Sequence, residues 1–357
     1  MAYLPLSTAN LPDPVIDPAQ GASPEDYFNT VLYTGTGSAV DINTVGFQPD
    51  LVWGKKRSAP NQNNWLIDSV RGAGVWLASD GTGAEGTEPA GSSFDADGFN
   101  TNSNSLFTYT GGSYVMWSWK ANGSGVTNTD GSITSTVSAN TTSGFSIVSY
   151  TGTGANATVG HGLDSAPEMI IFKERNGATN WPVYHSGLSS AAYALELNQT
   201  LAQFSYPAYF QSTAPTSSVF YIGTDTYINN SSDTYIAYCF HSVDGFSKFG
   251  SYVGNGSADG AFVYTGFRPA FVMIKRTDST QDWHIVDVER STFNTVIDYL
   301  LPNSSGAEFT SSSNPIDLLS NGFKFRDTGS RVNASGGTYI FMAFSDANGP
   351  FKYSNAR

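Results

Sequence analysis

The sequence contains a single cysteine, Cys239, so no disulfide within the chain can stabilise it. Charged residues make up only 13% of the 357 residues, which is about half of the share in ordinary soluble proteins. Gly, Ser, Thr and Asn take their place. This composition suits short strands joined by many turns, because Gly and Asn accept positive φ angles. It suits long helices poorly, because Ala, Leu, Glu and Lys are the residues that favour them.

Basic residues are few, since 17 Lys and Arg stand against 30 Asp and Glu and give a formal net charge of −13. A nucleic-acid binder needs a basic surface to contact phosphates, so we expect no nucleic-acid partner. We also expect no membrane insertion, because the sequence has no run of about 18 apolar residues. Residues 1–27 lack the basic and apolar regions of a secretion signal, which predicts folding in a cytoplasm.

Apolar and aromatic residues are plentiful, at 39% and 14%, and the length allows two or three domains. Comparison of the sequence with itself reveals three copies of one pattern. Each copy opens with a strand-like segment that runs into a glycine-rich turn. These openings are residues 28–37, 145–154 and 249–256.

A proline, a dense apolar run, a lysine and a tryptophan then follow in each copy. The prolines are Pro49, Pro167 and Pro269, the lysines are Lys55, Lys173 and Lys275, and the tryptophans are Trp65, Trp181 and Trp283. Prolines and lysines are each separated by 118 and then 102 residues, and the tryptophans by 116 and 102. This shared register indicates one folding unit present three times. The runs 169–172 and 271–274 are apolar on both faces, which predicts central strands covered on both sides.

Each copy closes with a further strand, at residues 114–119, 235–240 and 339–344. Successive side chains of a strand point to opposite faces, so the large ones gather on one face. That face carries Val115, Trp117 and Trp119, then Ile236, Tyr238 and Phe240, and finally Ile340, Met342 and Phe344. We expect it to fill the interior of each module. The opposite face has a small residue at one matched position, namely Ser118, Cys239 and Ala343.

These features predict an all-β fold of three tandem β-sandwich or jelly-roll-like modules behind an extended N-terminal arm. The predicted boundaries are 1–27 for the arm and 28–123, 144–245 and 246–357 for the modules. Residues 124–143 are rich in Ser, Thr, Asn and Gly. They form either a flexible linker or an extra hairpin around Asp130 and Gly131.

The arm contains five prolines and no periodic pattern, which excludes a helix or a central strand. It also carries apolar residues that a purely soluble tail does not need. These are Tyr3, Leu4, Leu6, Leu11, Val15 and Ile16. We expect them to dock on a neighbouring subunit or another protein; an inert disordered leader is the alternative.

Each central strand ends in a basic cluster a few positions before the tryptophan. The clusters contain Lys55, Lys56 and Arg57, then Lys173 and Arg175, and finally Lys275 and Arg276. Cations beside an aromatic ring can hold an anionic sugar or a carboxylate-rich partner, so these are the candidate contact residues. The alternative is that they are charged strand ends whose stems lie over the module rim, with the tryptophans as ordinary core.

The sequence shows no catalytic pattern. The histidines, His161, His185, His241 and His284, have no metal-type partner at short spacing. Asp95 and Asp97 precede Gly98 like half of a calcium loop, but a hairpin turn explains them, because the third copy lacks the carboxylate pair. We therefore predict a non-enzymatic protein with no catalytic residues, no metal and no cofactor.

Four stretches of the first copy and its leader carry a family resemblance. They read LPLSTANLP, then F-x-T-V-x-Y-T-G-x-G, G-F-x-P-D-L-V-W-x-K and W-x-x-D-S-V-R-G, at residues 4–12, 28–37, 46–55 and 65–72. The set resembles uncharacterised β-rich repeat modules of tailed-bacteriophage virion structural proteins, of tail-fibre, tail-associated or head-decoration type. The other copies have drifted, and we interpret residues 184–187 and 287–290 as having lost the Asp-Ser-Val-Arg-Gly motif. The resemblance implies no catalytic residues.

The leading hypothesis is a bacteriophage virion structural protein, a host-facing tail-fibre or tail-associated component anchored by its arm. It would assemble in the host cytoplasm and leave by lysis. We expect a homo-oligomer, with a trimer as one option, and other tail or capsid proteins and a host-surface glycan as candidate partners. A capsid decoration or cement protein is the first alternative. A stand-alone carbohydrate-binding module is the second, and it requires exposed rings at Trp65, Trp181 or Trp283.

Overall fold

A computed structural model describes Ile16 and residues 22–59, 62–87, 91–102, 106–312 and 314–345. Its elements are almost all strands arranged in antiparallel sheets, which confirms the predicted all-β class. The described helices are single turns: η3 (Pro24–Asp26), α1 (Pro207–Phe210) and α2 (Thr226–Asn229). None of the helices in this part of the chain is long and apolar enough to cross a membrane.

Each copy builds its main sheet from four strands in one order: the opening strand, the closing strand, the strand after the proline, and the next strand. Module 1 (residues 28–123) uses β1 (Phe28–Thr34), β9 (Ser113–Trp119), β3 (Leu51–Lys56) and β4 (Asn64–Asp68). Module 2 (residues 124–245) uses β12 (Phe145–Thr151), β19 (Thr234–Phe240), β14 (Met169–Glu174) and β15 (Pro182–His185). Module 3 (residues 246–345) uses β20 (Ser247–Val253), β28 (Thr338–Ser345), β22 (Pro269–Arg276) and β23 (His284–Asp287).

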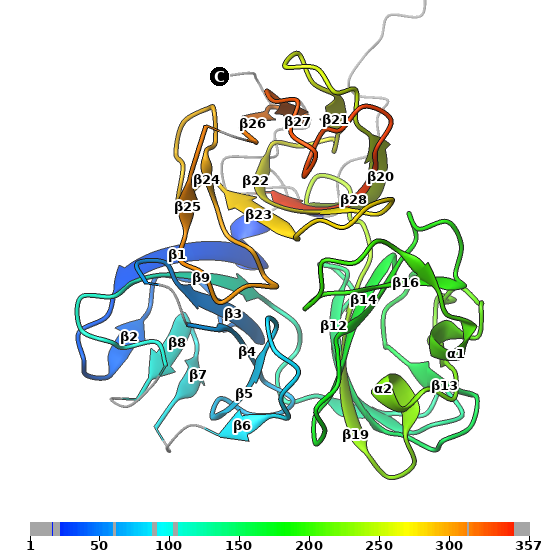
Figure 1. The fold of residues 1–357 in the computed structure, drawn as a ribbon. Helices are drawn as coiled ribbons and strands as arrows, with labels where there is room; N and C mark the ends of the chain where they lie inside the picture. The colour runs from blue at the N-terminus through cyan, green and yellow to red at the C-terminus, as the bar shows by residue number, and fades with distance from the viewer. Residues whose placement is uncertain are drawn as a thin grey trace, which may run out of the picture.

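A smaller layer of strands covers the outward side of each main sheet (Figure 1). In module 1 it consists of β2 (Val40–Ile42), β8 (Gly98–Thr101) and β7 (Ser93–Asp95). In module 2 it is the pair β13 (Ala157–Gly160) and β18 (Val219–Ile222). In module 3 it consists of β21 (Phe262–Tyr264), β27 (Gly322–Phe325) and β26 (Ile316–Leu319). Each module therefore has two layers, with a core of its own between them.

Further short strands extend the main sheets or flank them. They are β5 (Val75–Ala78) and β6 (Gly86–Thr87) in module 1, β16 (Tyr193–Glu196) and β17 (Phe204–Ser205) in module 2, and β24 (Asp298–Tyr299) and β25 (Phe309–Thr310) in module 3. Residues 124–143 contain a hairpin, because β10 (Val126–Asn128) pairs with β11 (Ser135–Asn140) and β11 continues onto β12. Val137 of this hairpin is buried in the core of module 2.

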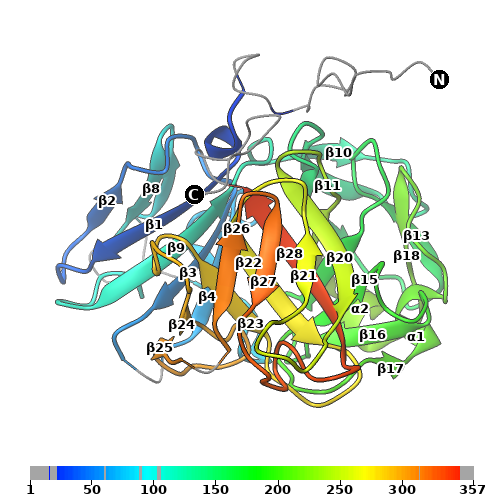
Figure 2. The same ribbon diagram turned by 90° about the horizontal axis from the view of Figure 1, so that it is seen from above.

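The three modules surround a common centre, with module 1 in blue and cyan, module 2 in green, and module 3 in yellow to red (Figures 1 and 2). A fourth apolar core, shared by all three, lies there. At one matched position of the closing strands, Trp119, Phe240 and Phe344 form a closed triangle. Its ring centroids are 6.4 Å apart for Trp119 and Phe240, 6.2 Å for Phe240 and Phe344, and 5.7 Å for Trp119 and Phe344.

The predicted role of the large closing-strand face is therefore corrected. Val115, Trp117 and their counterparts fill the shared core, not the interior of each module. The opposite face, with Tyr114 and Cys239 among its residues, fills the individual cores. A strand's alternation shows that two faces differ, but it does not show which other element covers each face.

Of the six apolar arm residues predicted to dock, Ile16 is the one that the structure describes, and it is completely buried. Ile16 belongs to the shared core of its own chain, which corrects its predicted docking on a neighbouring subunit. Burial of its side chain in the shared core contributes about 1.5–3 kcal/mol, so this docking holds the arm to the body at that point. The other predicted docking residues, Tyr3, Leu4, Leu6, Leu11 and Val15, lie outside the described residues.

Candidate functional site at the junctions between modules

The first lysines of the basic clusters, Lys55, Lys173 and Lys275, are fully buried at matched positions of β3, β14 and β22. The Nζ of Lys173 donates to the carbonyl of Gly177 at 3.1 Å and to Oγ1 of Thr179 at 3.2 Å. Burial lowers the pKa of each of the three lysines to about 8. These ammonium groups hold loops in place, and their predicted contact with an external ligand is wrong because solvent does not reach them.

Two of these lysines also join neighbouring modules. Lys55 of module 1 donates to the carbonyl of Ser304 in module 3 at 3.3 Å and to the carbonyl of Gln62 within its own module. Lys275 of module 3 donates to the carbonyl of Thr200 in module 2 at 3.2 Å. The same structural position therefore links module 1 to module 3 and module 3 to module 2.

The remaining basic residues lie closer to solvent, and two of the three arginines form ion pairs across junctions. Arg57 of module 1 pairs with Glu308 of module 3 at 2.7 Å, and Arg175 of module 2 pairs with Glu85 of module 1 at 2.9 Å. Arg276 instead pairs with Asp278 in its own module at 2.8 Å. Lys56 lies over the ring of Tyr109 with its Nζ 5.0 Å from the centroid.

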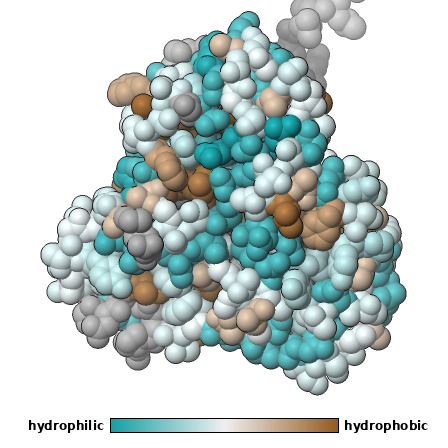
Figure 3. All heavy atoms as spheres, in the orientation of Figure 1, coloured by the Kyte–Doolittle hydropathy of each residue, from teal (hydrophilic) through white to brown (hydrophobic). Residues whose placement is uncertain are grey.

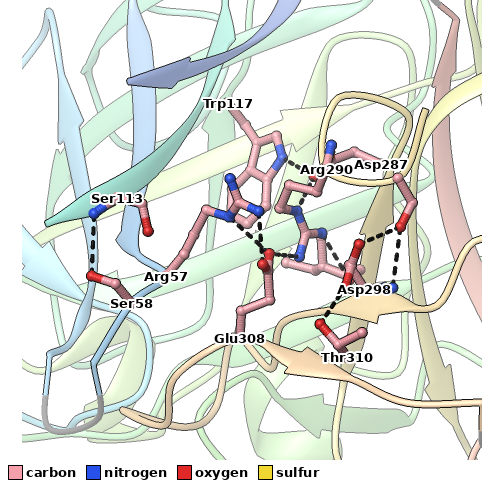
Figure 4. A network of polar contacts seen from close by, with 11 residues as sticks. Arg57, Ser58, Ser113, Trp117, Asp287, Arg290, Asp298, Glu308 and Thr310 are labelled. Carbon is pink, nitrogen blue, oxygen red and sulfur yellow. Dashed lines mark hydrogen bonds and ion pairs between the residues drawn. The ribbon is translucent and has the colours of Figure 1, made fainter. Parts of the chain in front are cut away.

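The junction of modules 1 and 3 contains a continuous polar network (Figure 4). Glu308 lies between two guanidinium groups: it accepts two hydrogen bonds from Arg57, at 2.9 and 2.7 Å, and one from Arg290, at 3.1 Å. The Nε of Arg290 donates to Asp287 at 2.6 Å, and the indole N–H of Trp117 donates to the same carboxylate oxygen at 3.0 Å. Arg290 and Asp287 have no exposed side-chain surface, so their charges are compensated inside the molecule.

The junction of modules 1 and 2 repeats this arrangement with Asp68 and Arg71. Arg71 donates to Asp68 at 2.5 Å, and the hydroxyl of Tyr238 in module 2 donates to the same oxygen at 2.8 Å. Tyr238 and Trp117 occupy matched positions of their closing strands, so each sends a donor into the carboxylate of the next module. Module 3 has kept the Asp and Arg of the motif, as Asp287 and Arg290, which corrects the interpretation that it lost them.

The third junction, between modules 2 and 3, has a different donor. The matched closing-strand residue is Met342, which has no polar hydrogen, and the residue matched to Asp68 is His185. The Nε2 of His185 lies 3.2 Å from the carbonyl of Phe341, and its Nδ1 accepts from the backbone N–H of Gly187 at 2.9 Å. This pairing makes Nε2 the protonated nitrogen, and burial lowers the pKa of His185 to about 4.

The three tryptophans are buried, at 7% exposure for Trp65, 0% for Trp181 and 1% for Trp283. Strand register also shows that they are not equivalent. Trp65 lies opposite Gly54 in β3, whereas its matched residue in module 3 is His284, opposite Ile274. A shift of one residue reverses the face, so Trp65 packs in the core of module 1 while the other two lie in the shared core.

The indole N–H groups of the two central tryptophans also cross junctions. Trp181 donates to the carbonyls of Ala78 and Gly81 in module 1, both at 3.0 Å, and Trp283 donates to that of Glu196 in module 2 at 3.1 Å. A carbohydrate-binding surface made of exposed tryptophans at these positions is therefore excluded. The alternative stated above, that the tryptophans are ordinary core residues, holds for Trp65. Trp181 and Trp283 instead join neighbouring modules.

Comparison of the sequence with known families finds a family that covers all three modules. Residues 23–348 match a family described as a domain of unknown function, DUF7483. The chain belongs to this family. The match spans all three modules, so the unit that the family defines is the complete three-module body and not a single repeat. No curated protein matches the sequence.

Two further residues that the sequence singled out have structural surroundings in this DUF7483 chain. Cys239 is fully buried, and burial raises the pKa of its thiol above the ordinary range. Asp95 forms a hairpin pair with Gly98 and accepts from the hydroxyl of Ser93 at 2.8 Å, which is the turn geometry favoured above. Among the described residues, no group of three or more His, Cys, Asp and Glu side chains is placed to hold a metal ion.

Sequence reasoning missed the residues that make the junctions. The charged side chains at these junctions are Asp68, Arg71, Asp287, Arg290 and Glu308. The sequence signal for the first four is the spacing of Asp and Arg by three residues. That spacing occurs at 68–71 and again at 287–290, three positions apart on the turn after β4 and β23. These charged groups hold the three similar modules in one fixed arrangement.

Proposed function

We propose that this chain is a non-enzymatic structural protein of a bacteriophage virion, in a tail-fibre or tail-associated position that faces the host. The observation that carries the proposal is the way its charges are used. Two of its three matched lysines and two of its three matched arginines bond across junctions, and the buried carboxylates Asp68 and Asp287 accept from the neighbouring module. These contacts surround a shared apolar core and not an open cleft. Such a body is suited to bear load and to present surfaces.

The resemblance of residues 4–12, 28–37, 46–55 and 65–72 to virion modules supplies the biological setting. The arm would anchor the body to the particle through the residues that precede the buried Ile16. Copies repeated on one particle would then add weak contacts with a host through their high effective concentration.

A capsid decoration or cement protein is the second candidate, and the threefold arrangement of the modules favours it. Three modules with similar main sheets surround one centre and face outward in three directions (Figure 1). Such a body could contact three equivalent shell subunits at once.

Localisation on the particle tests both candidates. Antibodies against the purified full chain, detected by gold particles in negative-stain electron microscopy of the phage that encodes it, should label the tail. Labelling of the capsid faces would replace the tail proposal by the decoration proposal. Purified particles that lack the protein by mass spectrometry would overturn both.

A further inference from the structure

Two aromatic side chains stand exposed on the outer layer of module 3. Phe262 and Tyr264 lie at alternate positions of β21, with exposed fractions of 46% and 64%, while Val263 between them is buried in the module core. β21 is one of the two edge strands of its sheet. Two apolar rings on the solvent face of an edge strand are an unusual exposure for a soluble body.

The other modules show that the fold does not require these rings. In module 1, Gly98 faces the carbonyl of Ile42 in the way that Gly322 faces that of Val263, which aligns β2 with β21. The residues matched to Phe262 and Tyr264 are then Asp41 and Asn43. Module 2 has Thr158 and Gly160 at these positions, by the pairing of Val159 with Phe220. Only module 3 places aromatics there.

Both rings lie next to glycines. A Cβ built on Gly322 would come within 2.9 Å of the Phe262 ring, and one on Gly266 would lie 3.5 Å from the Tyr264 hydroxyl oxygen. A Cβ on Gly322 would therefore displace the Phe262 ring, whereas the position beside Tyr264 is an ordinary contact. Both rings keep exposed surface that a ligand can reach.

Charged groups of opposite sign border the rings. Lys324, which pairs with Phe262 across the strands, contacts Asp259 at 2.7 Å, and Arg326 contacts Asp317 at 2.5 Å. Two cations and two carboxylates leave this border without net charge. The border supplies hydrogen-bond donors and acceptors but no preference for a charged ligand, and the overall charge of −13 disfavours polyanions.

We propose that Phe262 and Tyr264, with Asp259, Lys324 and Arg326 at their border, form a binding platform for a neutral carbohydrate. A sugar ring has an apolar C–H face that can stack on an aromatic ring and a rim of hydroxyls that can bond the charged border. This occupant fits better than an apolar peptide, which would take water away from the paired border charges without offering them hydrogen bonds in return. The inference names the host-surface glycan of the proposed tail position, and it rests on that function for its biological setting.

The test uses the purified full chain on an array that carries neutral hexose oligosaccharides beside sialylated and sulfated glycans. The wild-type chain should bind neutral oligosaccharides weakly. Calorimetric titration with the best-binding oligosaccharide then measures the affinity. The variant Phe262→Thr with Tyr264→Asn, which copies the other modules, should weaken that binding at least tenfold. Phe293→Ser removes a ring that is 83% exposed outside the platform and should change nothing. Unaltered melting temperatures will show that both variants are folded.

Several outcomes overturn the platform. They are no binding to neutral glycans, binding confined to anionic glycans, or binding that the double variant retains. A synthetic peptide of residues 1–15 that binds the wild-type chain but not the double variant would replace the sugar by the proline-rich arm of another copy. Particle labelling is read separately: a labelled tail without glycan binding leaves the proposed function intact, and glycan binding by a protein absent from particles removes only the setting.

Discussion

Replacement of Asp68 by Asn is expected to destabilise the whole body strongly. The carboxylate accepts from Arg71 and from Tyr238 of the next module, and neither Asp68 nor Arg71 has exposed side-chain surface. The amide keeps the size of the side chain but leaves the Arg71 guanidinium buried, with Glu85 as its nearest remaining carboxylate at 3.9 Å. Removing one partner of a buried ion pair costs about 3–5 kcal/mol.

Urea denaturation followed by tryptophan fluorescence measures this loss, because the midpoint shifts at constant slope when only stability changes. Asp278→Asn is the matched control: it breaks the Arg276–Asp278 pair, in which the carboxylate side chain is 37% exposed, and should cost about 0–1 kcal/mol. Removing both charges, by Asp68→Asn with Arg71→Met, should cost less than Asp68→Asn alone. Equal effects of Asp68→Asn and Asp278→Asn would refute the reasoning that the buried pair joins the modules.

Three further predictions concern His185, Trp119 and Gly98. Burial holds the pKa of His185 near 4 in the folded chain, against about 6.5 when unfolded, so the unfolded state binds the extra proton and stability falls as pH drops below 6.5. The loss between pH 7 and pH 5 is about 2 kcal/mol, and urea titrations should show a smaller loss in His185→Gln. Trp119→Ala opens the central triangle and should lower the free energy of unfolding by about 3–5 kcal/mol without splitting the transition. Gly98→Ala places a Cβ 1.8 Å from the carbonyl oxygen of Ile42, so thermal melting should show a loss of stability well beyond the about 0.5 kcal/mol of an ordinary surface substitution. Gly83→Ala, whose Cβ meets open space, should show no such loss.

Much of the fold could be predicted from the sequence because the repeated pattern carries it. The register of prolines and lysines located β3, β14 and β22, and the apolar runs 169–172 and 271–274 predicted strands covered on both sides. That prediction is confirmed: alternate residues of β14 and β22 pack in the module core and in the shared core. A strand that is apolar at every position must be covered on both faces, and the sequence alone shows this for the two runs.

The junctions could not be predicted, because their partners are far apart in sequence. Nothing local distinguishes a buried Lys275 from a strand-end lysine in solvent, since its acceptor is the carbonyl of Thr200 in another module. Trp65 was matched to Trp181 by spacing, yet strand pairing offsets it by one residue and turns it to the other face. Register is settled by hydrogen bonding between strands, which a spacing of tryptophans does not encode.

The surface gave the least signal of all. On the face drawn in Figure 3, apolar residues are scattered among hydrophilic ones and do not gather in one large patch. The aromatic pair Phe262 and Tyr264 stood out only when the three modules were aligned by structure, because the matched residues of module 1, Asp41 and Asn43, are polar. Internal copies thus serve as controls for one another.

Differential scanning calorimetry of the intact chain tests the central claim most directly. If a shared core and buried junctions make three modules one cooperative body, a single transition should appear, with a calorimetric enthalpy equal to the van't Hoff enthalpy. Two or three separable transitions, or a calorimetric enthalpy that exceeds the van't Hoff value severalfold, would show that the modules melt independently and would contradict the account.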